Sequence, residues 1–157
     1  MEKDHYIGVD ISKRTIDVAI YVKNQVKKGT FPHETFSNSE DGFKDMKRWL
    51  RKQNAVLPKS LFCMEATGNY TYELCLFLEQ QSVDYSIQSP IHLKRSFGLT
   101  HGKNDKVDAS RIAYYAYLHR DDIKSSKLAS DNVRKLKLLI AERKSLVVEI
   151  ARCKAQL

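Results

Sequence analysis

Two β-rich runs separated by three polar residues constrain the fold of this chain more than any other sequence feature. Residues 5–11 (HYIGVDI) and 15–22 (TIDVAIYV) flank the short polar break Ser12-Lys13-Arg14. A break of this length joins neighbouring strands as an antiparallel hairpin, so we expect such a hairpin to open the domain. The run at 28–38 predicts a third strand, at an edge or a bulge because it contains Pro32.

The residues that follow alternate between helical and extended patterns. Apolar residues spaced by three and four predict helices over 39–53 and 70–81. Runs at 60–65 and 83–88 predict two more strands, the first buried on both faces as in a mixed sheet. Within the second helix we expect the inward residues to be Leu74, Leu76, Phe77 and Leu78. This order of elements predicts an α/β fold in which helices flank a mixed sheet.

After Pro90 the chain becomes helical and basic. We expect a loop at 100–104 and then a helix over 105–119, with Ala109, Ile112, Ala113 and Ala116 facing inward. Between 131 and 157 a seven-residue repeat predicts a coiled-coil-like helix that needs a partner, although Arg143 and Lys154 break the repeat at two of its positions. The apolar residues of the repeat are Val133, Leu136, Ile140, Val147, Ile150 and Leu157. We therefore expect a domain over 1–120 and a basic helical extension over 121–157. Because the repeat is unfinished at Leu157, we also expect the chain to be part of a longer protein.

The positive charge of the chain lies in its second half. Residues 90–157 contain 15 Lys or Arg and 7 Asp or Glu, which accounts for the whole net charge of +8. Clustered cations are typical of a surface that binds a nucleic acid through its phosphates, although a solvated basic face has the same composition. The candidate phosphate contacts are Lys13, Lys94, Arg95, Lys103, Lys106 and Arg111.

Other features exclude several classes of protein. The apolar stretches are too short to cross a bilayer, and the first residues, MEKDH, lack the apolar core of a signal peptide. We therefore expect a cytoplasmic protein with no membrane partner. Three cysteines are an odd number without the short spacings of a zinc site, so we expect reduced thiols.

Four acidic residues stand out because of where they fall. Asp10 interrupts the apolar pattern of the first strand, and Glu65 closes the apolar run at 60–65. Ends of neighbouring strands at the carboxyl edge of an α/β sheet commonly form ligand sites. Asp105 and Asp108, three residues apart on the predicted helix, share a face with Ala109. The four carboxylates, which lie on three different elements, can therefore come together in the folded chain.

Four adjacent carboxylates would repel one another unless they took up protons or bound cations. Mg²⁺ or Mn²⁺ are the natural counter-charges for oxygen ligands, and two such ions support in-line displacement at a phosphodiester. Each acid also has a simpler interpretation: Asp10 as a turn cap, Glu65 as the partner of a lysine, and Asp105 as an acid at a helix start.

Three motifs in a fixed order carry a resemblance to a known family. They are GVDISK at 8–13, MEATGNY at 64–70 and KNDKVDASRIA at 103–113. Together they resemble the amino-terminal DEDD domain of insertion sequence 110 family transposases, with which Piv-type DNA invertases share a pattern. The resemblance extends over essentially the full chain.

The resemblance implies a RuvC-like fold of the ribonuclease H type. It also implies a Mg²⁺ site formed by Asp10, Glu65, Asp105 and Asp108, with Mn²⁺ as a substitute, and an activity in DNA transposition and recombination. Family members are thought to use a bridge RNA and to act as oligomers through helical segments, so DNA, a structured guide RNA and a second copy are the implied partners. The implied location is the cytoplasm of a bacterial or archaeal cell, in association with the nucleoid.

Family members also carry a carboxyl-terminal domain with a serine nucleophile, which has no counterpart in these 157 residues. We therefore do not expect full recombination from this chain alone. Two other hypotheses remain: a free-standing RuvC-like nuclease that uses a metal-bound water, and a non-catalytic module that binds nucleic acid and oligomerises. A sugar-kinase-like ATPase is disfavoured, because the chain lacks a convincing glycine-rich phosphate loop.

Overall fold

The computed structural model describes residues 3–22, 31–97 and 105–156; the side chains of 94, 97 and 105–107 are not among those described. The chain divides into two compact units, residues 1–127 and 128–157, here called the sheet domain and the C-terminal segment. Residues 121–127, assigned above to the helical extension, therefore belong to the first unit.

The sheet domain is built on five strands in the order β3-β2-β1-β4-β5. β1 (His5–Ile11) and β2 (Thr15–Val22) form the predicted antiparallel hairpin, and β3 (His33–Ser37) pairs with β2 at one edge. β4 (Ser60–Glu65) and β5 (Asp84–Gln88) extend the other side in parallel with β1. The sheet is therefore mixed, as predicted.

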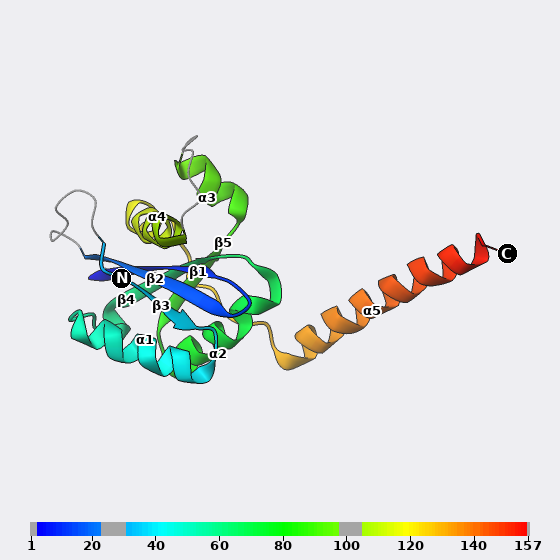
Figure 1. Cartoon of the computed structure of the whole chain (residues 1–157), viewed down its shortest axis with the longest axis horizontal. Helices are drawn as coiled ribbons and strands as arrows, with labels where there is room; N and C mark the ends of the chain where they lie inside the picture. The colour runs from blue at the N-terminus through cyan, green and yellow to red at the C-terminus, as the bar shows by residue number, and fades with distance from the viewer. Residues whose placement is uncertain (1–2, 23–30, 98–104, 157) are drawn as a thin grey trace. The chain divides into compact units, whose positions relative to one another are not determined.

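Helices cover both faces of the sheet (Figure 1). α1 (Glu40–Lys52) and α2 (Tyr72–Gln80) lie on one face, where the Sγ atom of Cys75 is 3.8 Å from the Sδ atom of Met64. α3 (Pro90–Phe97) and α4 (Asp105–Leu118) lie on the other, where Leu93 and Ile112 pack against Cys63. Coverage on both faces explains why all but one residue of β1, and all but one of β4, are buried.

Local sequence explains where the first helix begins. The side chain of Ser39 accepts a hydrogen bond from the backbone N–H of Gly42, and Glu40 and Asp41 follow in the first turn. A capping serine and early acids satisfy the unpaired N–H groups of a helix start. Phe43, Met46 and Leu50 form the buried stripe of this helix.

Three expectations differ from the structure in detail. The third described strand is five residues long and begins just after Pro32, whereas 23–30 lie outside the described residues. The helix expected from residue 70 begins with a 3₁₀ turn, Gly68–Thr71, and the α-helix starts at Tyr72; another 3₁₀ turn, Leu57–Lys59, precedes β4. In α2 the buried residues are Leu74, Cys75 and Leu78, so the inward assignment of Leu76 and Phe77 was wrong. The loop expected at 100–104 also falls outside the described residues.

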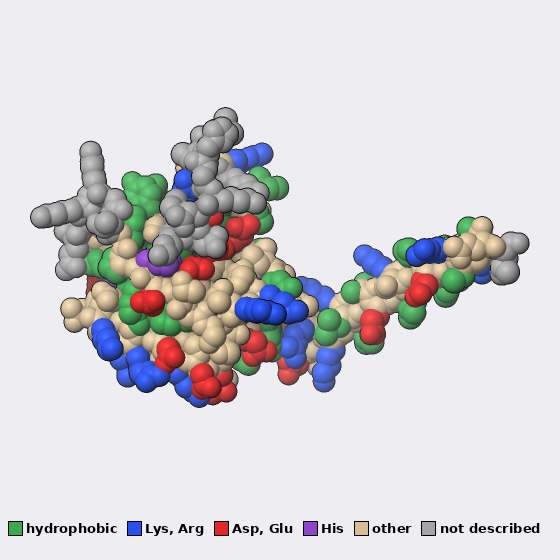
Figure 2. Space-filling model, viewed as in Figure 1, with side chains coloured by type: hydrophobic (Ala, Val, Ile, Leu, Met, Phe, Trp, Pro, Cys, Tyr) green, Lys and Arg blue, Asp and Glu red, His purple; other side chains and the backbone are tan. Residues whose placement is uncertain are grey.

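The C-terminal segment contains one long helix, α5 (Asp131–Lys154). None of its residues is buried, and hydrophobic, basic and acidic side chains all lie on its surface (Figure 2). The predicted repeat is exposed throughout its described length, from Val133 at 44% to Ile150 at 55%. Within the described ranges, no helix combines the length and hydrophobicity that a membrane span requires.

Candidate functional site

Asp10 and Glu65 occupy equivalent places at the ends of two adjacent parallel strands. Val9 pairs with Met64 in the register of β1 and β4, and the two acids follow one step later on their strands. Asp10 is the one residue of β1 that is not buried, and Glu65 is the one such residue of β4. The two carboxylates are therefore neighbours at the carboxyl edge of the sheet.

Both acids point to the face that α4 covers. Gly8 pairs with Cys63, and Cys63 packs against Ile112 of α4. Because side chains alternate along a strand, residues two positions later lie on the same face as this pair. Asp10 and Glu65 therefore lie on the α4 side, opposite the face that α1 and α2 cover.

The start of α4 approaches the same edge. A Cβ atom on Gly8 would overlap the backbone of Ala109 and Ala113, so helix and strand are in direct backbone contact. Ala116, further along the helix, packs in a cluster with Tyr6. α4 thus runs antiparallel to β1, and its first turns lie toward the end of β1 that carries Asp10.

Asp108 comes immediately before Ala109, whose backbone contacts Gly8. Asp105, one turn earlier, is the first residue of α4. The carboxylate of Asp108 is 40% exposed, and its Oδ1 lies 3.4 Å from Nη1 of Arg111. The side chain of Asp105 lies outside the described residues. Among the described side chains, no group of three His, Cys, Asp or Glu is close enough to hold a metal ion. The meeting of all four carboxylates therefore stays a prediction.

Sequence analysis missed a fifth acid on the same face. Asp17 of β2 pairs directly with Asp10 of β1. The hydroxyl of Thr35 donates a 2.5 Å hydrogen bond to Oδ1 of Asp17, and Nε2 of His33 lies 3.4 Å from the same oxygen. The sequence could have predicted this pairing. Asp10 and Asp17 are each three residues from the Lys13-Arg14 tip of the hairpin, so they lie opposite each other.

The candidate phosphate contacts are only partly described. Lys13 at the hairpin tip and Arg95 on α3 are exposed, whereas Arg111 is half-buried and paired with Asp108. Lys103 and the side chains of Lys94 and Lys106 fall outside the described residues.

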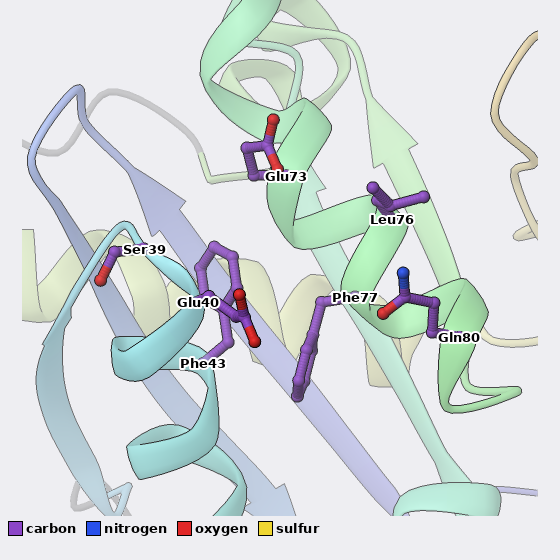
Figure 3. Close-up of a pocket in the computed structure, with 7 residues that line it drawn as sticks. All are labelled: Ser39, Glu40, Phe43, Glu73, Leu76, Phe77 and Gln80. Atoms are coloured by element: carbon purple, nitrogen blue, oxygen red, sulfur yellow. The ribbon is translucent and has the colours of Figure 1, made fainter. Parts of the chain in front are cut away.

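A pocket of about 420 Å³ lies between α1 and α2 (Figure 3). Its lining includes the half-buried Leu76 and Phe77, together with Glu40 and Glu73. It lies on the face of the sheet opposite α4 and is lined by none of the acids predicted from the sequence. The carboxylate edge is thus separate from this pocket.

Comparison with known proteins identifies the family to which the chain belongs. A family model described as Transposase, for the DEDD transposases of insertion sequence 110, matches residues 7–157. The chain belongs to this transposase family. The identification made from the three sequence motifs is therefore confirmed.

Curated relatives of this transposase domain include two pilin gene-inverting proteins, from Moraxella bovis and Moraxella lacunata. Each is 30% identical over 141 residues, which cover 88% of this chain and 41% of the relative. The chain thus spans about two fifths of the length of these relatives.

Two solved structures of RuvC from Thermus thermophilus share the fold. The first, in complex with a Holliday junction substrate, has a TM-score of 0.53 at 10% identity and covers 78% of this chain and 99% of its own. The second has a TM-score of 0.50 at 11% identity with the same coverage. The sheet domain therefore has a RuvC-like fold, as expected.

Proposed function

We propose that this chain is the metal-dependent catalytic domain of a DNA transposase or recombinase that acts on DNA phosphodiesters. The observation that carries the proposal is the register of β1 and β4, which sets Asp10 beside Glu65 on the face where α4 begins. The relatives named as gene-inverting proteins support DNA as the substrate, because inverting a gene requires DNA strands to be broken and rejoined.

The residues proposed to hold Mg²⁺, or Mn²⁺ in its place, are Asp10, Glu65, Asp105 and Asp108. Carboxylate oxygens are the ligands that these hard cations prefer. When bound, such ions polarise a phosphate and stabilise the charge that develops on the leaving oxygen. Asp108 and Arg111 form a partly exposed pair at 3.4 Å within one turn of α4, and helical pairs of this kind contribute little stability, so the pair is no obstacle to cation binding.

Six Lys and Arg residues are proposed to position the DNA backbone. Lys13 lies at the tip of the hairpin, just beyond the end of β1 that carries Asp10. Together with Lys94, Arg95, Lys103, Lys106 and Arg111, it would contact phosphate oxygens, which need only cations at suitable spacing.

The intact protein is further proposed to act as an oligomer with a structured guide RNA. Support for the RNA is the basic charge of residues 90–157, which suits a second polyanion. Support for the oligomer is α5, whose hydrophobic repeat is exposed along its described length. A helix with such a stripe gains stability by burying it against a partner helix.

Binding of Mn²⁺ tests the proposed carboxylate site directly. We expect titration followed by electron paramagnetic resonance to show Mn²⁺ binding to this chain, and Asp10→Asn and Glu65→Gln each to weaken it at least tenfold. The control is Asp41→Asn, which removes one charge from a side chain of α1 that is 92% exposed. Wild-type affinity in both site variants would refute the proposal.

DNA binding tests the phosphate contacts. For a four-way junction, we expect affinity to fall as salt rises, and Lys13→Gln or Arg95→Gln to reduce the slope of that dependence by about one each. Lys44→Gln, on α1, is the matched control and should leave the slope unchanged. Mg²⁺-dependent junction cleavage abolished by Asp10→Asn would show that the chain is a nuclease on its own.

A further inference from the structure

Asp17 lies where it can influence Asp10 without being one of the four proposed metal ligands. The two residues face each other across the β1–β2 hairpin. Side chains of directly opposed residues share a face, with Cβ atoms about 4.5–5.5 Å apart. Tyr21, four residues after Asp17 and on the same face, stacks on Tyr117 of α4 at a ring distance of 4.3 Å. Asp17 therefore points to the α4 side, as Asp10 does.

The carboxylate of Asp17 is fixed from the β3 side. Thr35 lies opposite it in the β2–β3 register and donates the 2.5 Å hydrogen bond to Oδ1. His33 contacts the same oxygen at 3.4 Å, and the side chains of Asp17 and His33 are each only 14% exposed. A carboxylate held by a hydroxyl donor in a mostly buried place keeps one orientation.

We propose that Asp17 is a positioning residue of the carboxylate edge, which acts through Asp10 and raises the affinity of that edge for a divalent cation. This inference rests on the proposed function. Carboxylates on directly opposed residues repel each other, and a bound cation relieves this repulsion, so Asp10 with Asp17 opposite favours cation binding more than Asp10 alone does. Thr35 and His33, on the β3 side of Asp17, keep its carboxylate in one place over the sheet so that it does not turn out to solvent.

Mn²⁺ affinity measured by electron paramagnetic resonance tests this role. We expect Asp17→Asn to weaken binding about tenfold, the size of effect typical of groups that orient a metal ligand. Asp41→Asn removes the same charge from an exposed side chain and should bind as the wild type. Thermal unfolding without metal identifies variants that fail to fold.

Variants of Thr35 separate positioning from simple strand stability. Thr35→Val removes the hydroxyl while keeping a β-branched side chain, and we expect Mn²⁺ affinity to fall several-fold. Thr35→Ser retains the hydroxyl and should restore wild-type affinity. A role confined to strand packing would predict the opposite order, because valine is the better strand residue.

Two results would overturn the inference, and they differ. If Asp10→Asn weakens Mn²⁺ binding but folded Asp17→Asn does not, Asp17 has no part in the site and the proposed function stands. If Asp10→Asn and Glu65→Gln both bind as the wild type, the proposed site fails and the role of Asp17 fails with it.

Discussion

The three cysteines differ in how far the fold buries their thiols. Cys63 and Cys75 are buried, and burial raises the pKa of each to about 12, with Glu79 adding to the effect at Cys75. Cys153 is exposed on α5. Because the thiolate is the reactive form, Cys63 and Cys75 are almost entirely unreactive thiols near neutral pH.

We therefore expect a thiol reagent at pH 8 to modify one cysteine per native chain and three in guanidinium chloride. Mass spectrometry of the labelled peptides should identify Cys153, and Cys153→Ser should abolish the rapid reaction. Rapid labelling of Cys63 in the folded chain would contradict the buried position assigned to β4.

At the residue scale, the sequence drew attention to Asp10 and Glu65, which break an apolar pattern. It did not draw attention to Asp17, whose position is an ordinary one for a polar residue. Asp10 and Glu65 interrupt buried strands, so their positions are conspicuous. Asp17 lies in the first half of β2, where polar and apolar residues alternate over Thr15–Val18 and a polar residue is ordinary. Its proposed role depends on pairing with Asp10 and on Thr35, and such contacts follow from register rather than from composition.

At the scale of elements, the contact between β1 and α4 sets the place of Asp108. Gly8 permits this contact, because any side chain there would meet the backbone of Ala109 and Ala113. Backbone cannot rotate away as a side chain can, so the helix or the strand would have to move.

We expect Gly8→Ala to lower the free energy of unfolding by about 3 kcal/mol, the upper end of the range for overpacked cores. Gly68→Ala is the comparison: its φ of +70° is unfavourable for alanine, but no atom lies within 4 Å of the added Cβ. Its cost should stay near 1 kcal/mol. Urea denaturation measures both, and equal effects would show that the α4 contact is not tight.

Elements with a strong local signal were predicted well. The hairpin, α1 and the Ala109–Ala116 stripe of α4 follow from short breaks, capping and periodicity, and the structure confirms them. The inward face of α2 was wrong because nine residues in which most positions are apolar do not define one stripe. Leu76 and Phe77 line the pocket beside α1 instead, an outcome that depends on where α1 packs.

At the scale of the whole molecule, one polar cluster ties distant parts of the sheet domain together. The Nζ atom of Lys3 lies 2.6 Å from Oδ2 of Asp84 and donates a 3.0 Å hydrogen bond to the carbonyl of Pro58. Ser125 donates to Oδ1 of Asp84 at 3.2 Å. The start of the chain, β5 and the segment after α4 thus meet at one carboxylate.

The hydrogen bond from Lys3, more than that from Ser125, lowers the pKa of Asp84 below its ordinary value of 3.8. A lowered folded-state pKa stabilises the fold above the unfolded-state value, and this stability is lost as the pH falls through the folded-state value. We expect Asp84→Asn to be less stable than the wild type in urea at pH 7, with the difference shrinking below pH 4. Asp121→Asn, at an 85% exposed side chain, should show little change at either pH. A difference that persists at low pH would exclude the ion pair as its cause.

The exposed hydrophobic repeat of α5 predicts that copies of this chain associate with one another. We expect this chain to self-associate in analytical ultracentrifugation and Ile140→Lys, on the hydrophobic repeat of α5, to abolish it. Val148→Lys adds the same charge at a 68% exposed position outside the repeat and should leave association intact. A wild-type chain that stays monomeric up to high concentration would refute pairing through α5.

The segment after α4 also protects the outer strand β5. The N–H of Ser126 donates to the carbonyl of Tyr85, and the Ser126 hydroxyl accepts from the N–H of Ile87. Exposed strand edges recruit other chains into intermolecular sheets. A shortened chain should therefore extend through Lys127. Ending it at residue 120 would expose the Tyr85 carbonyl and the Ile87 N–H of β5, and we expect such a chain to aggregate.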